Sequence, residues 1–432
     1  MKHLFAAALI AAFAPLAAPN ASAADVPLTL AEAQRRAVDR SAQVTAQEAA
    51  IAAARHMAVA AGERPDPILK GGVNNLPVTG SERLSLGADF MTMRYVGLAQ
   101  ELTRGEKLEL RARRYELEAE KSTAGKDAAI AAIQRDTALA WIDRYYAEAM
   151  SRVIDEQAAQ ARLEIEAAES AYGEGHGSQA DVFAAHASLS LLDDRAEEYH
   201  RRAATARVAL ARWVGERAGA PLNGKPPLES IRFHHHDVDA QLASHPMIAM
   251  LAREEDIAAT EAKLARAELK PDWSVELMYS NRGPAFSDMV SIGISVPLQW
   301  DRPRRQDQAV AAKLAMADEA RALREDALRA HAAEIQAMTL EWESDRDRMA
   351  RYDRELLPLA RERSAAALAT YRGGKSSLMD VLSARRGEIE VRMQALQLEM
   401  ETARMWAQLN YVVPDETLLP PRLVPDHAEE HR

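Results

Sequence analysis

The sequence predicts a mainly α-helical fold that is internally duplicated and carries four β-strands. The first observation is a repeat, because residues 172–182 and 371–381 share Tyr, Gly, Ser, Asp and Val at the same spacing. The second is composition: 48% hydrophobic but only 5% aromatic residues are typical of long Ala- and Leu-rich helices rather than of a compact enzyme core. The third is a Pro-Asp pair in each half, at 65–66 and 271–272, followed by strand-like alternation.

The first half begins with a helix, for which Thr29 is the expected N-cap and Glu32 completes a capping box. A Gly- and Asn-rich stretch with two alternating pieces follows, and we expect these pieces to be strands around a surface loop. The next helix contains no proline and has two apolar stripes, so it should pack on two sides. The predicted elements are a helix over 28–64, strands over 84–90 and 93–98, a long helix over 104–172 and a helix over 178–213.

The second half repeats this plan. The two shorter helices of a half together match its long helix in length, so they can lie end to end beside it. The strand pair would then sit at one end of the helices and the Gly-containing turns at the other. The predicted elements are a helix over 237–270, strands over 273–280 and 289–298, a long helix over 304–371 and a last helix over 378–411.

The N-terminus has the layout of a secretory signal, with Lys2, an apolar stretch and an A-x-A site at 21–23. The chain contains no Cys, which excludes disulfides and a lipid-modified N-terminal Cys, so we expect an exported protein that is not lipidated. The expected division is a signal peptide over 1–23, a first repeat over 24–220, a linker over 221–236, a second repeat over 237–413 and a C-terminal tail over 414–432.

The charge and the hydropathy of the sequence limit the kinds of protein that it can encode. The net charge is -11, and basic residues are interspersed with acids, which argues against sequence-independent nucleic-acid binding. No segment after the signal has the roughly 18 consecutive apolar residues of a transmembrane helix. If the chain crosses a membrane, it must do so as strands closed into a barrel. Four strands in one chain leave free edges, so other chains would have to complete the closure.

The repeated Tyr-x-x-Gly-x-x-Ser-x-x-Asp-Val motif between long helices, with Pro-Asp before each strand pair, resembles the outer membrane efflux protein family, the TolC-like outer membrane factors. Within that family the sequence is most similar to the CusC/CzcC-type factors of heavy-metal efflux systems. The resemblance covers essentially the whole mature chain. It implies a homotrimer that forms a twelve-stranded β-barrel in the outer membrane and a twelve-helix α-barrel tunnel through the periplasm.

Asp181 and Asp380 occupy the positions that in the family project near the closed periplasmic end of the tunnel. Trimer symmetry would turn each into a ring of three carboxylates that attracts cations and gates the tunnel. The alternative is that each Asp only stabilises a helix N-terminus. Ser383 stands where some relatives have a second acid, which would weaken the charge of the gate.

The helix tips are the second candidate site, formed by Gly175, Ser178, Gly374 and Ser377. Both glycines lie in turns that should need a positive φ. The functional interpretation is docking of a periplasmic adaptor, and the alternative is a plain helix–helix turn. The two interpretations are compatible.

Two other groups of residues give weaker evidence for a functional site. His234, His235 and His236 invite a metal site, but consecutive histidines cannot all face one ion, and an exposed linker is the simpler interpretation. Four aromatic residues bracket the second strand pair, where either an interfacial belt or packing against a neighbour would place them. These residues are Trp273, Tyr279, Phe286 and Trp300.

No catalytic triad, phosphate loop or spaced zinc motif occurs in a suitable context, so we expect neither enzyme activity nor a cofactor. The leading hypothesis is a passive outer-membrane exit duct, working with a periplasmic adaptor (membrane fusion protein) and an inner-membrane pump. Its substrates would include heavy-metal cations, as the resemblance implies. The alternative is a periplasmic coiled-coil adaptor or scaffold, which would have one helical hairpin rather than two strand pairs within a helical duplication.

Overall fold

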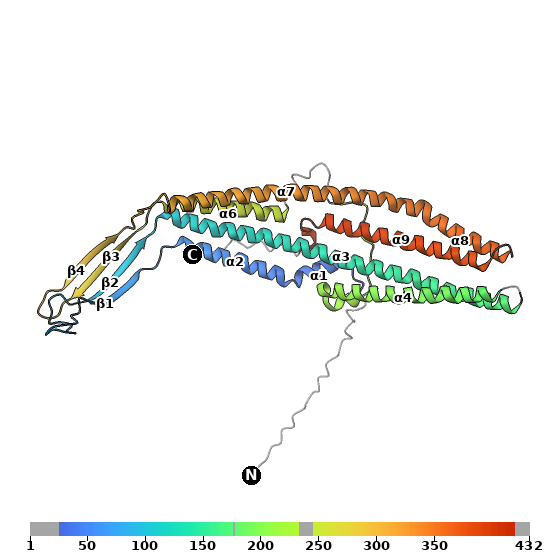
Figure 1. Cartoon of the computed structure of the whole chain (residues 1–432), viewed down its shortest axis with the longest axis horizontal. Helices are drawn as coiled ribbons and strands as arrows, with labels where there is room; N and C mark the ends of the chain where they lie inside the picture. Colours follow the sequence, from blue (N-terminus) through green and yellow to red (C-terminus); the bar gives the residue numbers. More distant parts are fainter. Residues whose placement is uncertain (1–25, 176–177, 233–244, 420–432) are drawn as a thin grey trace, which may run out of the picture.

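The computed structural model describes residues 26–175, 178–232 and 245–419. The molecule is elongated, with a sheet at one end, helix turns at the other and helices along the long axis between them (Figure 1). The helices are α1 (Leu30–Asp39), α2 (Ala42–Gly62), α3 (Gly105–Gly173), α4 (Gln179–Val214), α6 (Pro246–Glu268), α7 (Gln306–Arg351), α8 (Leu357–Arg372) and α9 (Leu378–Asn410). The strands are β1 (Ile68–Asn74), β2 (Met93–Leu102), β3 (Trp273–Asn281) and β4 (Met289–Ser295).

The long helix α3 has 69 residues, which corresponds to about 100 Å. Helices α2, α1 and α4 follow one another along it, as their summed length predicts (Figure 1). Both apolar stripes of α3 are buried within the chain, including Trp141, Ile142 and Tyr146. The main hydrophobic core surrounds these residues and also takes in Leu210 of α4 and Leu409 of α9.

Helix α7 is different, because most of its surface is exposed. Its exposed apolar residues include Met316, Leu323 and Leu340. One chain therefore covers both faces of α3, which α1, α2, α4, α6 and α9 surround, but leaves much of α7 uncovered.

The helix predicted over 28–64 is broken into α1 and α2. Ser41 causes the break, since its side chain accepts a hydrogen bond from the Val44 amide (3.3 Å) and starts a new helix. Thr29 is the N-cap of α1 as expected, and it accepts from the Glu32 amide (3.2 Å). The Glu32 carboxylate pairs with Arg36 one turn further on.

The helix predicted over 304–371 also differs. A π-helical turn over Tyr352–Leu356 separates α7 from α8. Pro358 lies in the first turn of α8. Proline lacks an N–H group, and its ring clashes with the carbonyl four residues earlier, so the helix accommodates it by widening the preceding turn.

One predicted strand was wrong. Residues 84–90 belong to the loop before β2, and the first strand is instead the glycine-rich segment Ile68–Asn74. Gly72 pairs with Tyr95, whose ring lies over it: a Cβ at Gly72 would meet the ring hydroxyl at 2.9 Å. Gly72 therefore makes room for an aromatic neighbour, rather than marking a turn.

The four strands form one antiparallel sheet in the order β1-β2-β3-β4. Cross-strand register gives the sheet one apolar face, where Leu69, Leu98, Leu277 and Ile292 lie in one row. On the other face Lys70 pairs with Glu276 (2.9 Å). The apolar face is exposed, and within the part of the chain that the structure describes β1 and β4 are unpaired edges.

Each Pro-Asp pair lies where helices meet the sheet, but the two copies differ. Asp272 is nearly buried and holds the start of α3: its Oδ2 accepts from Lys107 Nζ (2.7 Å) and its Oδ1 from the Arg104 amide (3.1 Å). Lys107 also donates to the Lys270 carbonyl (2.7 Å). Asp66, its counterpart, is exposed.

Among the helices that the structure describes, none contains a stretch long and apolar enough to cross a lipid bilayer.

Candidate functional site

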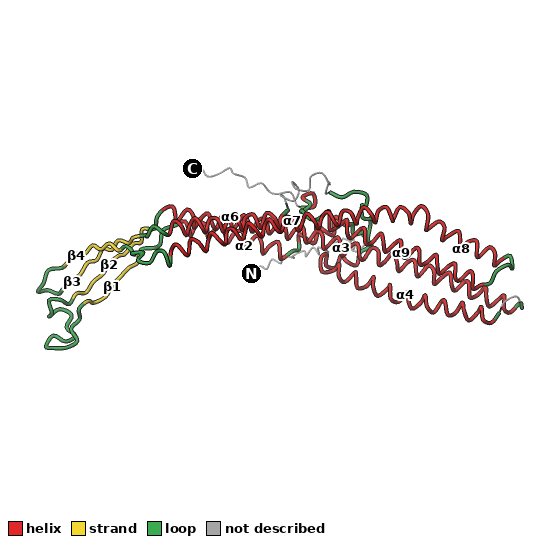
Figure 2. The backbone as a smooth tube through the Cα atoms, turned by 45° about the horizontal axis from the view of Figure 1, so that its top comes forward, coloured by secondary structure: helices red, strands yellow, loops and turns green. Residues whose placement is uncertain are grey.

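Two helix turns lie together at the end of the molecule opposite the sheet (Figure 2). The first joins α3 to α4 and the second joins α8 to α9. Gly175 and Gly374 have φ values of 77° and 69°, the left-handed conformation that glycine adopts without strain. Among the described residues, no atom lies within 4 Å of a Cβ built on either glycine, so backbone conformation rather than crowding favours glycine there.

Both turns end in the same capping box. At the first tip, Ser178 Oγ accepts from the Asp181 amide (3.1 Å), while Asp181 Oδ2 accepts from the Ser178 amide (3.2 Å). At the second tip, Ser377 and Asp380 make the equivalent bonds at 3.3 Å and 3.0 Å. The Ser and Asp of the repeated motif therefore satisfy amide groups that would otherwise lack partners at a helix start.

The Asp380 carboxylate is exposed, and contacts with Ser377 change its pKa. Hydrogen bonds from the Ser377 hydroxyl and then from its amide hold the pKa of Asp380 below its usual value. Asp380 thus stays ionised to a lower pH than an ordinary aspartate. The observed contacts of Asp181 and Asp380 establish the capping role, and their expected role as carboxylate rings needs further chains.

The valines of the motif pack the two tips against each other. Val381 is fully buried in a cluster that includes Ile165 of α3 and Ala185 of α4, with Val182 packed against it. The first and second repeats are therefore joined at their tips by apolar contact, so a displacement of one tip would affect the other. We did not predict this cluster from the sequence. The valines lie at helical spacing from the buried leucines, and that pattern could have indicated a shared buried face.

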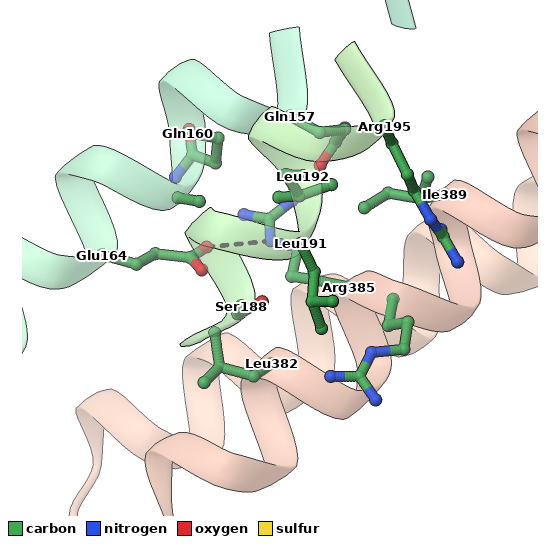
Figure 3. Close-up of a pocket in the computed structure, with 12 residues that line it drawn as sticks. Gln157, Gln160, Glu164, Ser188, Leu191, Leu192, Arg195, Leu382, Arg385 and Ile389 are labelled. Atoms are coloured by element: carbon green, nitrogen blue, oxygen red, sulfur yellow. Dashed lines mark ion pairs between the residues drawn. The ribbon is translucent and has the colours of Figure 1, made fainter. Parts of the chain in front are cut away.

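Behind the tips, α3, α4 and α9 enclose a small cavity of about 80 Å³ (Figure 3). Arg385 of α9 lies 3.3 Å from Glu164 of α3, whose side chain is 10% exposed, and 3.7 Å from Glu388. This ion pair is a second connection between the repeats. Nothing in the local sequence indicates it, because the partners come from different halves of the chain.

The aromatic residues of the second strand pair lie at distinct levels. Trp273 and Tyr279 share the apolar face near opposite ends of β3. Phe286 lies in the turn after β3, with Arg282 over its ring at 5.7 Å. Trp300 follows β4 and is 90% exposed.

The predicted histidine run, 234–236, lies outside the described residues. Among the described residues, no group of three or more His, Asp or Glu side chains is arranged to hold a metal ion. His245 caps α6 by accepting from the Met247 amide (3.1 Å) and stacks on His331 with ring centroids 4.7 Å apart. Burial, and then proximity to His331, lowers the pKa of His245 to about 4.

Comparisons with known proteins agree with this geometry. Residues 238–413 match the model of the family described as outer membrane efflux protein. A search of curated proteins finds no significant match.

Solved structures extend the likeness along the chain. The fold is similar to that of the outer-membrane channel OprN, at 16% identity and a TM-score of 0.73 over 89% of this chain and 90% of that one. CusC is similar at 14% identity and a TM-score of 0.77, over 91% and 94% of the two chains. The outer membrane protein VceC of Vibrio cholerae is similar at 18% identity and a TM-score of 0.73, over 89% and 95%. At these identities the likeness shows the fold. Residues 238–413 therefore match the outer membrane efflux protein family in sequence, and the fold of solved outer-membrane channels extends over most of the chain.

Proposed function

We propose that this chain is the outer-membrane exit duct of a tripartite efflux system, with its helical part in the periplasm. Three copies form the duct, and substrates pass through it passively. A periplasmic adaptor binds the helix tips, and an inner-membrane pump supplies the energy. The assignment of heavy-metal cations as substrates is supported by the sequence resemblance alone.

The observation that carries the proposal is the sheet. One face is apolar and exposed, the other is polar, and both edges are unpaired. A bilayer tolerates a sheet only when every edge is paired and the outward face is apolar. Pairing β1 of one copy with β4 of the next satisfies both edges, and three copies with four strands each give twelve strands. Lipid would contact the apolar face and the lumen would be polar.

The helices support the same assembly. The exposed apolar residues of α7 need a partner surface, and a neighbouring copy would supply one. A periplasmic adaptor or scaffold, the second candidate, would have no use for a sheet with an exposed apolar face. We therefore retain the division into two repeats, 24–220 and 237–413, as the unit from which the duct is built.

Asp181 and Asp380 are proposed as the gate, and Gly175, Ser178, Gly374 and Ser377 as the adaptor-docking tips. The capping boxes support both roles, because they fix the direction in which each tip points. In each box, Oδ2 of the Asp accepts the described hydrogen bonds from the Ser amide and hydroxyl. Three copies arranged around an axis would bring like charges together at the narrow end, where they would attract cations.

The test is assembly and conduction. The mature protein, purified in detergent, should be trimeric by mass measurement, and it should form ion-conducting pores when reconstituted into planar bilayers. A protein that remains monomeric in detergent, or a trimer that inserts without conducting, would contradict the proposal.

A further inference from the structure

The segment that joins β4 to α7 begins with exposed apolar residues and ends with arginines. Val290, Ile292 and Ile294 of β4 lie on the apolar face of the sheet. Beyond the strand, Leu298 and Trp300 are 76% and 90% exposed, and the chain turns between them, where the Trp300 amide donates to the Leu298 carbonyl (3.0 Å). Arg302, Arg304 and Arg305 follow in the turn that precedes α7.

Contacts within the chain position this segment but leave its charges available. The Gln299 side chain, which lies between the two exposed apolar residues, donates to the Glu268 carbonyl at the end of α6 (2.9 Å). Arg302 pairs with Asp307 at the start of α7 (3.0 Å). Within the described chain Arg304 and Arg305 form no ion pair, and both are exposed.

The segment lies at the junction of the sheet with the helices (Figure 1). In a membrane-inserted sheet this level is the lipid–water interface, where Trp is enriched and where arginine meets lipid phosphates. Trp273, on the apolar face at the same end of the sheet, adds a second aromatic residue there. A covering protein surface would favour fewer unpaired charges at this level, so charge complementarity favours lipid.

We propose that Trp300, Arg304 and Arg305 form a binding site for an anionic phospholipid headgroup in the leaflet facing the helices. The inference rests on the proposed function, because it requires the sheet to be inserted in a membrane. The indole lies at the headgroup level beside the acyl chains, and the two guanidinium groups contact the lipid phosphate. Guanidinium is suited to this role because it donates two parallel hydrogen bonds to phosphate oxygens.

The electrostatic attraction sets the size of the effect. One arginine near an anionic surface gives about fivefold local enrichment of the anionic lipid. Two arginines should therefore enrich it severalfold more, with Asp301 and Asp307 reducing the gain.

Tryptophan fluorescence can measure this enrichment directly. The full-length mature protein would be reconstituted into phosphatidylcholine vesicles that contain a small, equal fraction of brominated phosphatidylglycerol or brominated phosphatidylcholine. The signal of Trp300 is the difference between the wild type and Trp300→Phe. We expect brominated phosphatidylglycerol to quench Trp300 at least threefold more strongly than brominated phosphatidylcholine does, a conservative threshold given the attraction of two arginines.

Two double variants make the comparison specific. Arg304→Gln/Arg305→Gln should make the two lipids quench Trp300 equally. Arg329→Gln/Arg361→Gln removes the same charge from exposed arginines on α7 and α8 and should leave the preference for the anionic lipid intact.

The experiment distinguishes failure of the headgroup site from failure of the proposed function. Equal quenching by the two lipids in the wild type would overturn the headgroup site. Absence of Trp300 quenching by either lipid would show that protein covers the indole, and would also overturn it. Trimer mass and pore conductance, measured on the same preparation, report separately on the proposed function. A chain that neither inserts nor conducts would refute both proposals.

Discussion

The buried ion pair at the junction of sheet and helices allows a sharp test of how the two are held together. In the Asp272→Asn variant the new amide oxygen can still accept from the Arg104 amide, but the ammonium of Lys107 loses its counter-charge. The Lys107 side chain is 4% exposed and that of Asp272 is 15% exposed. Removing one partner of a buried pair typically costs 3–5 kcal/mol, and the partial exposure of Asp272 places the expected cost at about 3 kcal/mol.

Asp66 provides the matched control, since it follows proline at the equivalent position of the first repeat and is exposed. Asp66→Asn should change stability by less than about 0.5 kcal/mol, as is usual for surface substitutions. Hydrogen exchange monitored by mass spectrometry over peptides from the start of α3 and the end of α6 measures the local effect. For Asp272→Asn we expect protection there to fall about 100-fold, which corresponds to the expected loss of free energy.

The pH dependence is a second signature of this pair. Burial acts to raise the pKa of Asp272, but the hydrogen bonds from Lys107 and from the Arg104 amide outweigh it and hold the pKa below its usual value. Because the pKa is depressed in the folded state, the contribution is fully present above the unfolded pKa of about 3.9 and is lost as pH falls through the folded value. Wild-type protection should be constant from pH 7 to 5 after correction for intrinsic exchange. If Asp272→Asn and Asp66→Asn lower protection equally, the pair does not hold the junction.

Three further predictions concern the other sites. His245, with its pKa lowered to about 4, stabilises the fold fully above the unfolded pKa of about 6.5 and progressively less as pH falls toward 4. Exchange at the start of α6 should therefore reveal on the order of 1 kcal/mol of destabilisation at pH 5, after allowing for solvent screening, and His245→Asn, which keeps a capping acceptor, should abolish this dependence. Gly374→Val should penalise the left-handed turn by roughly 1 kcal/mol or more and lower export and adaptor cross-linking while trimer yield persists; wild-type export would reduce the tip to a connector. Asp181→Asn together with Asp380→Asn keeps acceptors for the caps but removes the charges, so single-channel conductance should rise and block by multivalent cations should weaken. Unchanged conductance and block in an inserted trimer would leave both residues with the capping role alone.

The helix tips could be predicted from the repeated motif, because the interactions of the motif join residues that are close together in the sequence. A Ser three residues before an Asp can form a capping box wherever a helix begins, and a glycine just before it permits the positive φ that the turn needs. The structure has both left-handed glycines in the predicted turns, and it places each Asp of the motif at a helix start, within a capping box. The long helices were predictable for a similar reason, since two apolar stripes persist over many turns of α3.

Local reasoning failed where a distant partner decided the outcome. The glycines of β1 suggest a turn when read alone, but the segment pairs with β2 as a strand, and Gly72 leaves room for the ring of Tyr95. The break at Ser41 and the wide turn before Pro358 are local, and both residues could have been recognised from the sequence.

By itself, the sequence determined the long helices, the second strand pair, and the glycine turns and helix starts of the tips, because each depends on residues within a few turns of one another. Only the tertiary structure decided which Pro-Asp pair became a buried ion pair, how Arg385 joins the two repeats, and which sheet face gathers the apolar residues of all four strands. These features bring together side chains that are more than a hundred residues apart in the sequence. The packing of the whole chain places them within a few ångströms of one another, and no local pattern encodes that packing.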